Sequence, residues 1–478
     1  MFIDNILQIA TTAPDRVALL IDEQAYDYQY LLHRASIVAD WLTANSVTRL
    51  GICADRSVGN YVGIMACLLA GCAYVPLNLK LPSERLDAIK QQAQLDALFE
   101  EALFDFSQPS QPPRVIDVDM NQWVYMMFTS GSTGVPKGVP VTYAQLDTFI
   151  SMMQQHHQLT ADDRVAQHAD MSFDMSVYDI FMAWNAGACL CVVPESQRLA
   201  PAKFIQDTTV TVWFSVPSII GFMKQLKLLS PNSLPSLRLS LFSGEPLLVG
   251  DALDWQQAAA NSFVDNLYGP TEATVECMAY RLDASMDMEL GEQSILPIGE
   301  PLPGNTIALL DKDGQWVVDD QPGELLIAGP QIIAEYWDNP QLTAEKLIQK
   351  KHPDYGDQCW YRTGDQVYRD RAGCCHYLGR LDNQVKIQGH RVELEEVEHY
   401  LRQVTGCLDV AAVIVADERG DHLYGALEDP SLDQKVVKQQ LLQLLPFYMV
   451  PEQVVSVEQL PRSLNGKLDR RALIEMLT

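Results

Sequence analysis

Short apolar runs alternate with amphipathic stretches from the start of the chain to about residue 290. The apolar runs are rich in β-branched and aromatic residues, which predicts strands, and the amphipathic stretches between them predict helices. Strands that alternate with helices indicate an α/β fold with largely parallel sheets. The runs that we expect to be strands are RVALLI (16–21), RLGICA (49–54), WVYMMF (123–128), ACLCVV (188–193) and VTVWFS (210–215).

The pattern changes twice towards the end of the chain. Between about residues 295 and 380, short strand-like runs separated by Gly, Pro and Asp predict antiparallel β structure. A charged link follows, and the last part combines a helical pattern with a strand pattern. Because 478 residues exceed what one hydrophobic core supports, several domains are expected. We predict a large domain over 1–381, with parallel sheets and a β subdomain, and a small, mobile α+β domain over 382–478.

The net charge of −28 restricts the partners of this chain. An acidic surface repels nucleic-acid backbones and anionic lipid, so we expect neither nucleic-acid binding nor stable membrane insertion. The uncharged stretch 61–77 is shorter than the ~20 residues of a membrane span, and Gly71 and Pro76 favour a helix, a turn and a strand. The first residues lack the basic region of a signal peptide, and the ten cysteines form no CxxC pair, so a cytoplasmic protein with reduced thiols is expected.

A loop rich in hydroxyl groups and glycines follows one of the predicted strands, in the segment WVYMMFTSGSTGVPKGVPVTY (123–143). Glycines let backbone N–H groups turn towards one point, hydroxyls add donors, and a lysine adds positive charge. This combination predicts a cradle for phosphates, although it lacks the GxxxxGK[ST] pattern of a Walker loop. The expected cradle residues are Thr129, Ser130, Gly131, Ser132, Thr133, Gly134 and Lys137.

Further motifs follow one another along the chain in a fixed order. They are AGCAYVPLN (70–78), FDMSVYDIF from Phe173, LYGPTEATVE from Leu267, GELLIAGP from Gly323, YRTGD (361–365), GRLDNQVKIQGHRVELEEVE from Gly379, LPFYMVP (445–451) and NGKLDR (465–470). With these motifs, nearly the whole chain resembles the adenylate-forming (AMP-binding) superfamily, which includes acyl-CoA synthetases, luciferases, the adenylation domains of nonribosomal peptide synthetases and the D-alanine–carrier-protein ligases. One departure is Asn78, which stands where the family has an aspartate.

The resemblance implies that a carboxylate attacks the α-phosphate of ATP, a reaction in which two anions must be neutralised and aligned. By the same resemblance, Lys467 would bridge the substrate carboxylate and the α-phosphate, and Thr271 would contact that phosphate. Glu272 would bind Mg²⁺, which prefers carboxylate and phosphate oxygens. Because the attacking carboxylate is already ionised, no general base is needed. His168 and His390 are therefore expected to be structural.

The resemblance also implies a binding site for the adenosine part of ATP. Tyr268 would stack on adenine, with Gly269 beside it in the same motif. Asp365 would accept hydrogen bonds from the ribose hydroxyls, with Arg380 nearby.

The amino-acid branch of the family pairs the aspartate of its FDxS motif with the α-ammonium group of the substrate, and here this residue is Asp174. An unpaired buried carboxylate is costly, which favours an amino acid over a fatty acid. Bulky residues at several of the family's pocket positions imply a small side chain, and glycine, alanine and serine remain open. The other implied pocket residues are Met175, Tyr178, Ser215, Leu241, Ser243, Gly244, Leu267, Val275 and Glu276.

The chain ends soon after the NGK motif, so we expect the thiol acceptor to be the phosphopantetheine arm of a separate carrier protein. Whether such a system would serve peptide synthesis or the cell envelope stays open. In the family the small domain turns about a hinge, which would be Asp382 here. The alternatives are an acyl-CoA synthetase of the same fold and an inactive adenylate-binding scaffold.

Overall fold

The computed structural model describes residues 1–108, 118–131, 135–387, 389–417, 420–429, 433–462 and 468–478. The chain forms two compact units. The first comprises 1–77, 93–127 and 138–381, and the second comprises 78–92, 128–137 and 382–478. The second unit thus includes two segments that we expected in the large domain, in addition to the residues after 381.

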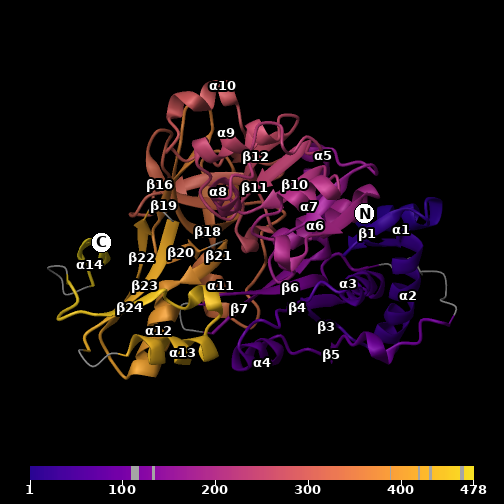
Figure 1. Ribbon diagram of the computed structural model, residues 1–478, viewed down its shortest axis with the longest axis horizontal. Coiled ribbons are helices and arrows are strands. Elements are labelled where there is room, and N and C mark those ends of the chain that lie inside the picture. Colours follow the sequence, from indigo (N-terminus) through magenta and orange to yellow (C-terminus); the bar gives the residue numbers. More distant parts are fainter. Residues whose placement is uncertain (109–117, 132–134, 388, 418–419, 430–432, 463–467) are drawn as a thin grey trace. The chain divides into compact units, whose positions relative to one another are not determined.

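The first unit contains a nine-stranded sheet in the order β14-β13-β12-β11-β10-β8-β9-β1-β2. Its central strands are parallel, and antiparallel strands lie at both edges (Figure 1). The strands are β1 (Val17–Ile21), β2 (Gln24–Asp27), β8 (Arg164–Gln167), β9 (Cys189–Val192), β10 (Val212–Ser215), β11 (Leu239–Phe242), β12 (Phe263–Tyr268), β13 (Met278–Arg281) and β14 (Glu300–Pro301).

Two five-stranded sheets complete the strands of the first unit. One has the order β5-β3-β4-β6-β7. The other is antiparallel, has the order β15-β16-β18-β17, and carries β19 on β18. Their strands are β3 (Arg49–Cys53), β4 (Ala73–Leu77), β5 (Ala97–Leu98), β6 (Trp123–Thr129), β7 (Lys137–Thr142), β15 (Thr306–Leu310), β16 (Pro322–Ala328), β17 (Leu347–His352), β18 (Gly356–Arg369) and β19 (Cys375–Arg380).

Local sequence signals set the bounds of two helices of the first unit. Thr142 and Gln145 form a reciprocal capping box at the start of α5, which satisfies backbone groups that the first turn leaves open. The uncharged stretch 61–77 folds as α3, a left-handed Gly71 and β4, so the predicted helix, turn and strand are confirmed. The helices of this unit are α1 (Phe2–Thr12), α2 (Tyr28–Ala44), α3 (Val58–Ala70), α5 (Tyr143–His157), α6 (Met175–Ala186), α7 (Ala202–Asp207), α8 (Ser218–Gln225), α9 (Val249–Ala258), α10 (Ala284–Asp287) and α11 (Pro340–Lys346).

The second unit has a two-stranded ribbon, β20-β21, and a three-stranded sheet, β22-β23-β24. Its helices cover a core that includes Val397, Leu401 and Leu441. In the part of the chain that the structure describes, no helix has both the length and the apolar character needed to cross a membrane. The elements are α4 (Ser83–Gln92), β20 (Gln384–Ile387), β21 (His390–Glu393), α12 (Leu394–Thr405), β22 (Val410–Asp417), β23 (Gly420–Leu427), α13 (Gln434–Leu444), β24 (Gln453–Ser456) and α14 (Arg470–Leu477).

One row of residues across the nine-stranded sheet positions much of the candidate site. Phe214 pairs with Leu241, Leu241 with Asp265, and Asp265 with Arg281. Neighbouring side chains of a strand point to opposite faces of a sheet, so these paired residues share one face. Phe214 and Leu241 belong to the core cluster that also contains side chains of α5 and α6.

Candidate active site

Asp174 lies directly before the first residue of α6 and is half-buried. The Asp174 carboxylate lies close enough to β6 for its charge to affect the pKa of Tyr125. Burial raises the pKa of Tyr125 well above its usual value, and the charges of Tyr74 and Asp174 raise it further. Asp174 is thus an acidic group at the edge of an apolar region, where a cation can be paired.

Behind Asp174 the predicted pocket residues are large and tightly buried. Met175, Tyr178, Leu241, Leu267 and Val275 all belong to one core cluster. Protein interiors are close-packed, so buried side chains leave few voids around them.

Gly244 lies against the same group of residues, after the end of β11. It has a φ of +90°, and a Cβ atom there would lie 3.2 Å from Val216 Cγ1 and 4.0 Å from the sulfur of Met175. Ser243, the residue before it, is buried, and its backbone N–H donates to the carbonyl of Ser215 over 3.3 Å.

The structure does not place the Ser215 side chain with the other predicted pocket residues. The indole N–H of Trp213 donates to Ser215 Oγ over 2.9 Å, and Trp213 belongs to the core cluster on the opposite face of the sheet. Phe214 instead shares the face of Leu241, and its ring lies 5.2 Å from the ring of Tyr178. A shift of one residue exchanges the two faces of a strand. Phe214 is therefore the β10 side chain that lies against Tyr178.

A tight loop over residues 269–276 connects β12 to β13. A Cβ atom on Gly269 would lie only 2.2 Å from the carbonyl oxygen of Val275, so no other residue fits there without a shift of the backbone. Thr274 and Val275 both have positive φ angles, of 54° and 72°. Such angles are unusual for a β-branched residue and persist only where the surroundings hold them.

Gln331 holds this loop in place. Its Nε2 donates to the carbonyls of Ala273, Thr274 and Glu276, and its own backbone carbonyl accepts from the hydroxyl of Thr274 over 2.6 Å. Gln331 is fully buried, so these bonds are shielded from water. Its role was not predicted, because nothing in the sequence links position 331 to the loop.

Glu272 is fully buried within the same loop, next to Thr271 in a short 3₁₀ turn. The hydroxyl of Tyr336 donates to Glu272 Oε1 over 2.6 Å. A carboxylate oxygen is a ligand that Mg²⁺ prefers. The residues present therefore fit the Mg²⁺ ion that we expected here.

Three of the residues expected to bind adenosine lie together. The hydroxyl of Tyr268 donates to one oxygen of Asp365, and Arg380 donates to the other over 3.0 Å. Asp365 on β18 is paired with Arg380 on β19, and both side chains are largely buried. A carboxylate can accept about four hydrogen bonds, so Asp365 keeps acceptor capacity for hydroxyl groups.

The described residues of the predicted phosphate cradle belong to the second unit. The hydroxyl of Thr129 is buried and has no hydrogen-bond partner among the described residues, as expected for a donor that awaits an anion. Gly131 is packed tightly, since a Cβ atom there would lie 2.1 Å from the carbonyl oxygen of Val135. Ser130 donates to the carbonyl of Arg391 over 2.7 Å, and Lys137 forms an ion pair of 3.0 Å with Glu393.

Four predicted site residues lie outside the described residues, namely Ser132, Thr133, Gly134 and Lys467. His168, which we expected to be structural, packs in the interior at 4.9 Å from the Trp213 ring. Burial lowers its pKa to about 3, so it is neutral at pH 7.

Comparisons with known proteins identify the family of this chain. The family model of AMP-binding enzymes matches residues 7–337. Tyrocidine synthase 3 of Brevibacillus parabrevis is 32% identical over 491 residues, and delta-poly-L-ornithine synthetase of Acinetobacter baumannii (strain AB307-0294) is 31% identical over 500 residues. Each of these matches covers 98% of this chain. The chain spans only 7% of the first relative and 36% of the second.

Two solved structures match over the full length of the chain. The Vibrio cholerae adenylation domain AlmE, in complex with glycyl-adenosine-5'-phosphate, is 33% identical with a TM-score of 0.89, covering 100% of this chain and 97% of AlmE. PA1221, an NRPS protein containing adenylation and PCP domains, is 25% identical with a TM-score of 0.83, covering 100% of this chain and 97% of that one. The chain therefore belongs to the family of AMP-binding enzymes, and it has the fold of their adenylation domains.

Proposed function

We propose that this chain activates a small amino acid with ATP to give an aminoacyl-adenylate, and then transfers the aminoacyl group to the phosphopantetheine thiol of a carrier protein. The observation that supports the proposal is that Asp174, directly before α6, is half-buried, while Met175, Tyr178, Leu241 and Leu267 are buried in one apolar core. An acidic group suits an α-ammonium group, and the filled pocket suits a short side chain.

Two steps make up the reaction. In the first, an oxygen of the amino-acid carboxylate attacks the α-phosphorus, the bond to the β-phosphate breaks, and pyrophosphate leaves. In the second, a thiolate attacks the carbonyl carbon and AMP leaves with the electrons of the C–O bond. Part of the free energy of the ATP phosphoanhydride bond is thereby retained in the thioester.

The residues of this chain would contribute binding and charge. Asp174 would pair with the ammonium group, and the Tyr268–Asp365–Arg380 group would hold the ribose side of the nucleotide. Bound Mg²⁺, held through Glu272, would neutralise phosphate charge. Lys467 would stabilise the negative charge that develops as the carboxylate meets the α-phosphate.

Glycine is the amino acid that we propose first. The Phe214 ring occupies the β10 position that we had expected Ser215 to contribute, so the pocket is smaller and less polar than the sequence implied. Serine would therefore meet fewer polar partners than its hydroxyl needs. AlmE, which was solved with glycyl-adenosine-5'-phosphate, supports the same choice.

An ATP–pyrophosphate exchange assay over all amino acids of both configurations tests the first step. We expect exchange to be fastest with glycine, weaker with alanine and serine, and at background with branched or aromatic amino acids. The same assay is run on Asp174→Ala, and its matched control is Asp207→Ala, because Asp207 is an exposed aspartate that pairs with Lys203 on the surface. Exchange that depends on a fatty or aryl acid, or on no added acid, would refute the proposal.

A loading assay tests the second step. Radiolabelled glycine, ATP and Mg²⁺ are incubated with a carrier protein that either carries or lacks phosphopantetheine, or with free coenzyme A. We expect label only on the phosphopantetheine-bearing carrier. Formation of glycyl-CoA at a similar or greater rate would instead favour the acyl-CoA synthetase alternative.

A further inference from the structure

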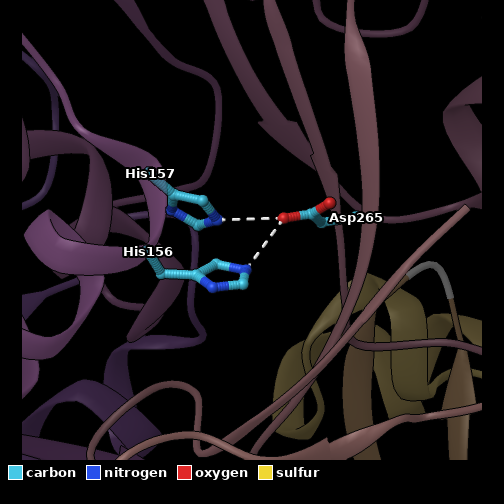
Figure 2. A group of neighbouring side chains, drawn as sticks. All are labelled: His156, His157 and Asp265. Carbon is cyan, nitrogen blue, oxygen red and sulfur yellow. Dashed lines mark hydrogen bonds and ion pairs between the residues drawn. The ribbon is translucent and has the colours of Figure 1, made fainter.

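A group of polar side chains around the buried His157 and Asp265 has no role in the steps described above. His156 and His157 end helix α5, and Asp265 lies on β12. Figure 2 shows both imidazole rings pointing towards the Asp265 carboxylate. Nε2 of His156 and Nε2 of His157 lie 3.1 and 3.2 Å from the same oxygen, Asp265 Oδ2.

Arg281, directly opposite on β13, fixes the other side of this carboxylate. Its Nε donates to Asp265 Oδ1 over 2.7 Å and its Nη2 donates to Oδ2 over 2.8 Å. Although burial raises the pKa of Asp265, the bonds from Arg281, His156 and His157 hold it well below its ordinary value. Asp265 is therefore ionised and can only accept hydrogen bonds.

The protonation state of His157 follows from this. Burial lowers its pKa to about 4, so at pH 7 the ring is neutral and carries one proton. Since Nε2 faces an ionised carboxylate, the proton is on Nε2, and Nδ1 must accept a hydrogen bond. The donor is the hydroxyl of Tyr178, 2.8 Å from Nδ1.

The group is not arranged as a metal site, although two histidines and an aspartate converge. Both oxygens of Asp265 already accept from a guanidinium group, whose charge would repel a cation. Nδ1 of His157 is taken by Tyr178, and Nε2 must stay protonated to donate to Asp265. Instead, successive hydrogen bonds connect Arg281 to Asp265, Asp265 to His157, and His157 to Tyr178.

Tyr178 is the only member of this chain of bonds, among the described residues, that we place in the pocket. It belongs to α6, one turn after Asp174, and its ring makes edge contacts with Phe214 at 5.2 Å and Phe149 at 6.4 Å. Edge contacts between rings contribute only about 0.5–1.5 kcal/mol each beyond the area they bury. The hydrogen bond from the Tyr178 hydroxyl to His157 is directional, so it fixes the position of the hydroxyl-bearing end of the ring.

We propose that His157 and Asp265 are positioning residues that set the size limit of the amino-acid pocket by holding the hydroxyl of Tyr178. With the bond intact, the Tyr178 ring stays in the pocket and excludes larger side chains. Without it, the ring can move and admit them. This inference rests on the proposed function, because it requires an amino acid in this pocket.

The test compares discrimination, defined as kcat/KM for the best small amino acid divided by kcat/KM for valine in the exchange assay. Tyr178→Phe removes one oxygen and keeps the ring, so the fold should be retained. We expect discrimination to fall by about tenfold, the equivalent of one buried hydrogen bond, with the KM for ATP unchanged. His157→Ala should lower it similarly, and His156→Ala, which loses a bond to Asp265 but none to Tyr178, should leave it within about twofold.

A double variant separates positioning from general packing. If His157 acts only through Tyr178, then adding His157→Ala to Tyr178→Phe should not lower discrimination further. Additive losses, or unchanged discrimination in Tyr178→Phe, would overturn the inference while leaving the proposed function intact. If the unmodified protein activates no amino acid at all, the proposed function fails, and this inference fails with it.

Discussion

The position of Phe214 can be tested against that of its neighbour, Ser215, by truncating each side chain to alanine. Phe214 is fully buried on the pocket face, so Phe214→Ala leaves a cavity beside Tyr178 and should cost about 3–5 kcal/mol of stability. A larger substrate can fill part of that cavity. Three buried carbon atoms at about 0.8 kcal/mol each give about 2.4 kcal/mol, which is roughly a 50-fold gain in kcat/KM for valine or leucine relative to glycine.

Ser215→Ala should behave in the opposite way. It removes the acceptor of the Trp213 indole N–H on the far face of the sheet, which leaves a buried donor unpaired and costs about 1–3 kcal/mol of stability. The amino-acid profile should stay the same, because the side chain does not reach the pocket.

The two variants are compared by urea denaturation and by pyrophosphate exchange with glycine, alanine, valine, leucine and phenylalanine. The assignment of the two faces of β10 would be refuted if Phe214→Ala kept the amino-acid profile of the unmodified protein and Ser215→Ala changed it. Exchange per folded molecule is the quantity to compare, since Phe214→Ala lowers the folded fraction.

Four further predictions concern other parts of the site. Asp174→Ala should lower kcat/KM for the amino acid by more than about 100-fold while ATP still binds, because an unpaired buried ammonium costs about 3–5 kcal/mol; ATP binding and exchange are measured separately, and near-normal exchange contradicts the pairing. Glu272→Gln keeps an oxygen for the Tyr336 hydroxyl but loses its charge, so half-maximal exchange should need at least about tenfold more Mg²⁺, and an unchanged Mg²⁺ titration speaks against a metal ligand. His157 has a folded pKa of about 4 and an unfolded pKa near 6.5, so the unfolded state binds the proton first as the pH falls. Stability should therefore decrease from pH 6.5 to pH 4 by up to about 3 kcal/mol, and urea midpoints should show a smaller decrease in His157→Gln. Asp382→Pro should retain adenylate formation and lose transfer to the carrier, whereas Lys467→Ala should fail at adenylation and still transfer from supplied aminoacyl-adenylate; equal losses of both steps in each variant would argue against a hinge at this position.

Much of the fold could be predicted from local patterns, because helices and strands have distinct periodicities. The mixed α/β fold with parallel sheets is confirmed, and so are the helix, turn and strand over 61–77. The motifs located Asp365 and Arg380 correctly as neighbours, since strand pairing in the antiparallel sheet brings them face to face.

The pocket was harder to predict, and the reasons are geometric. Ser215 and Phe214 differ by one position, and only the register of β10 against β11 decides which of them faces Tyr178. Strand alternation along VWFS could have signalled this, because Trp213 and Ser215 must share a face. The contact of His157 with Asp265 joins residues 108 positions apart, and it depends on the strand order, which a single sequence does not reveal.

The clamped loop over residues 269–276 has a consequence for how the specificity of such an enzyme can change during evolution. In the proposed function, Glu272 serves the nucleotide, while Val275 and Glu276 serve the amino acid, and Gln331 binds the backbone around all three. A substitution at 275 or 276 that suits a new substrate would therefore disturb the metal ligand three or four residues away. New specificities should arise more readily at Met175, Phe214 and Leu241, which lie on separate elements and can vary without disturbing ATP binding.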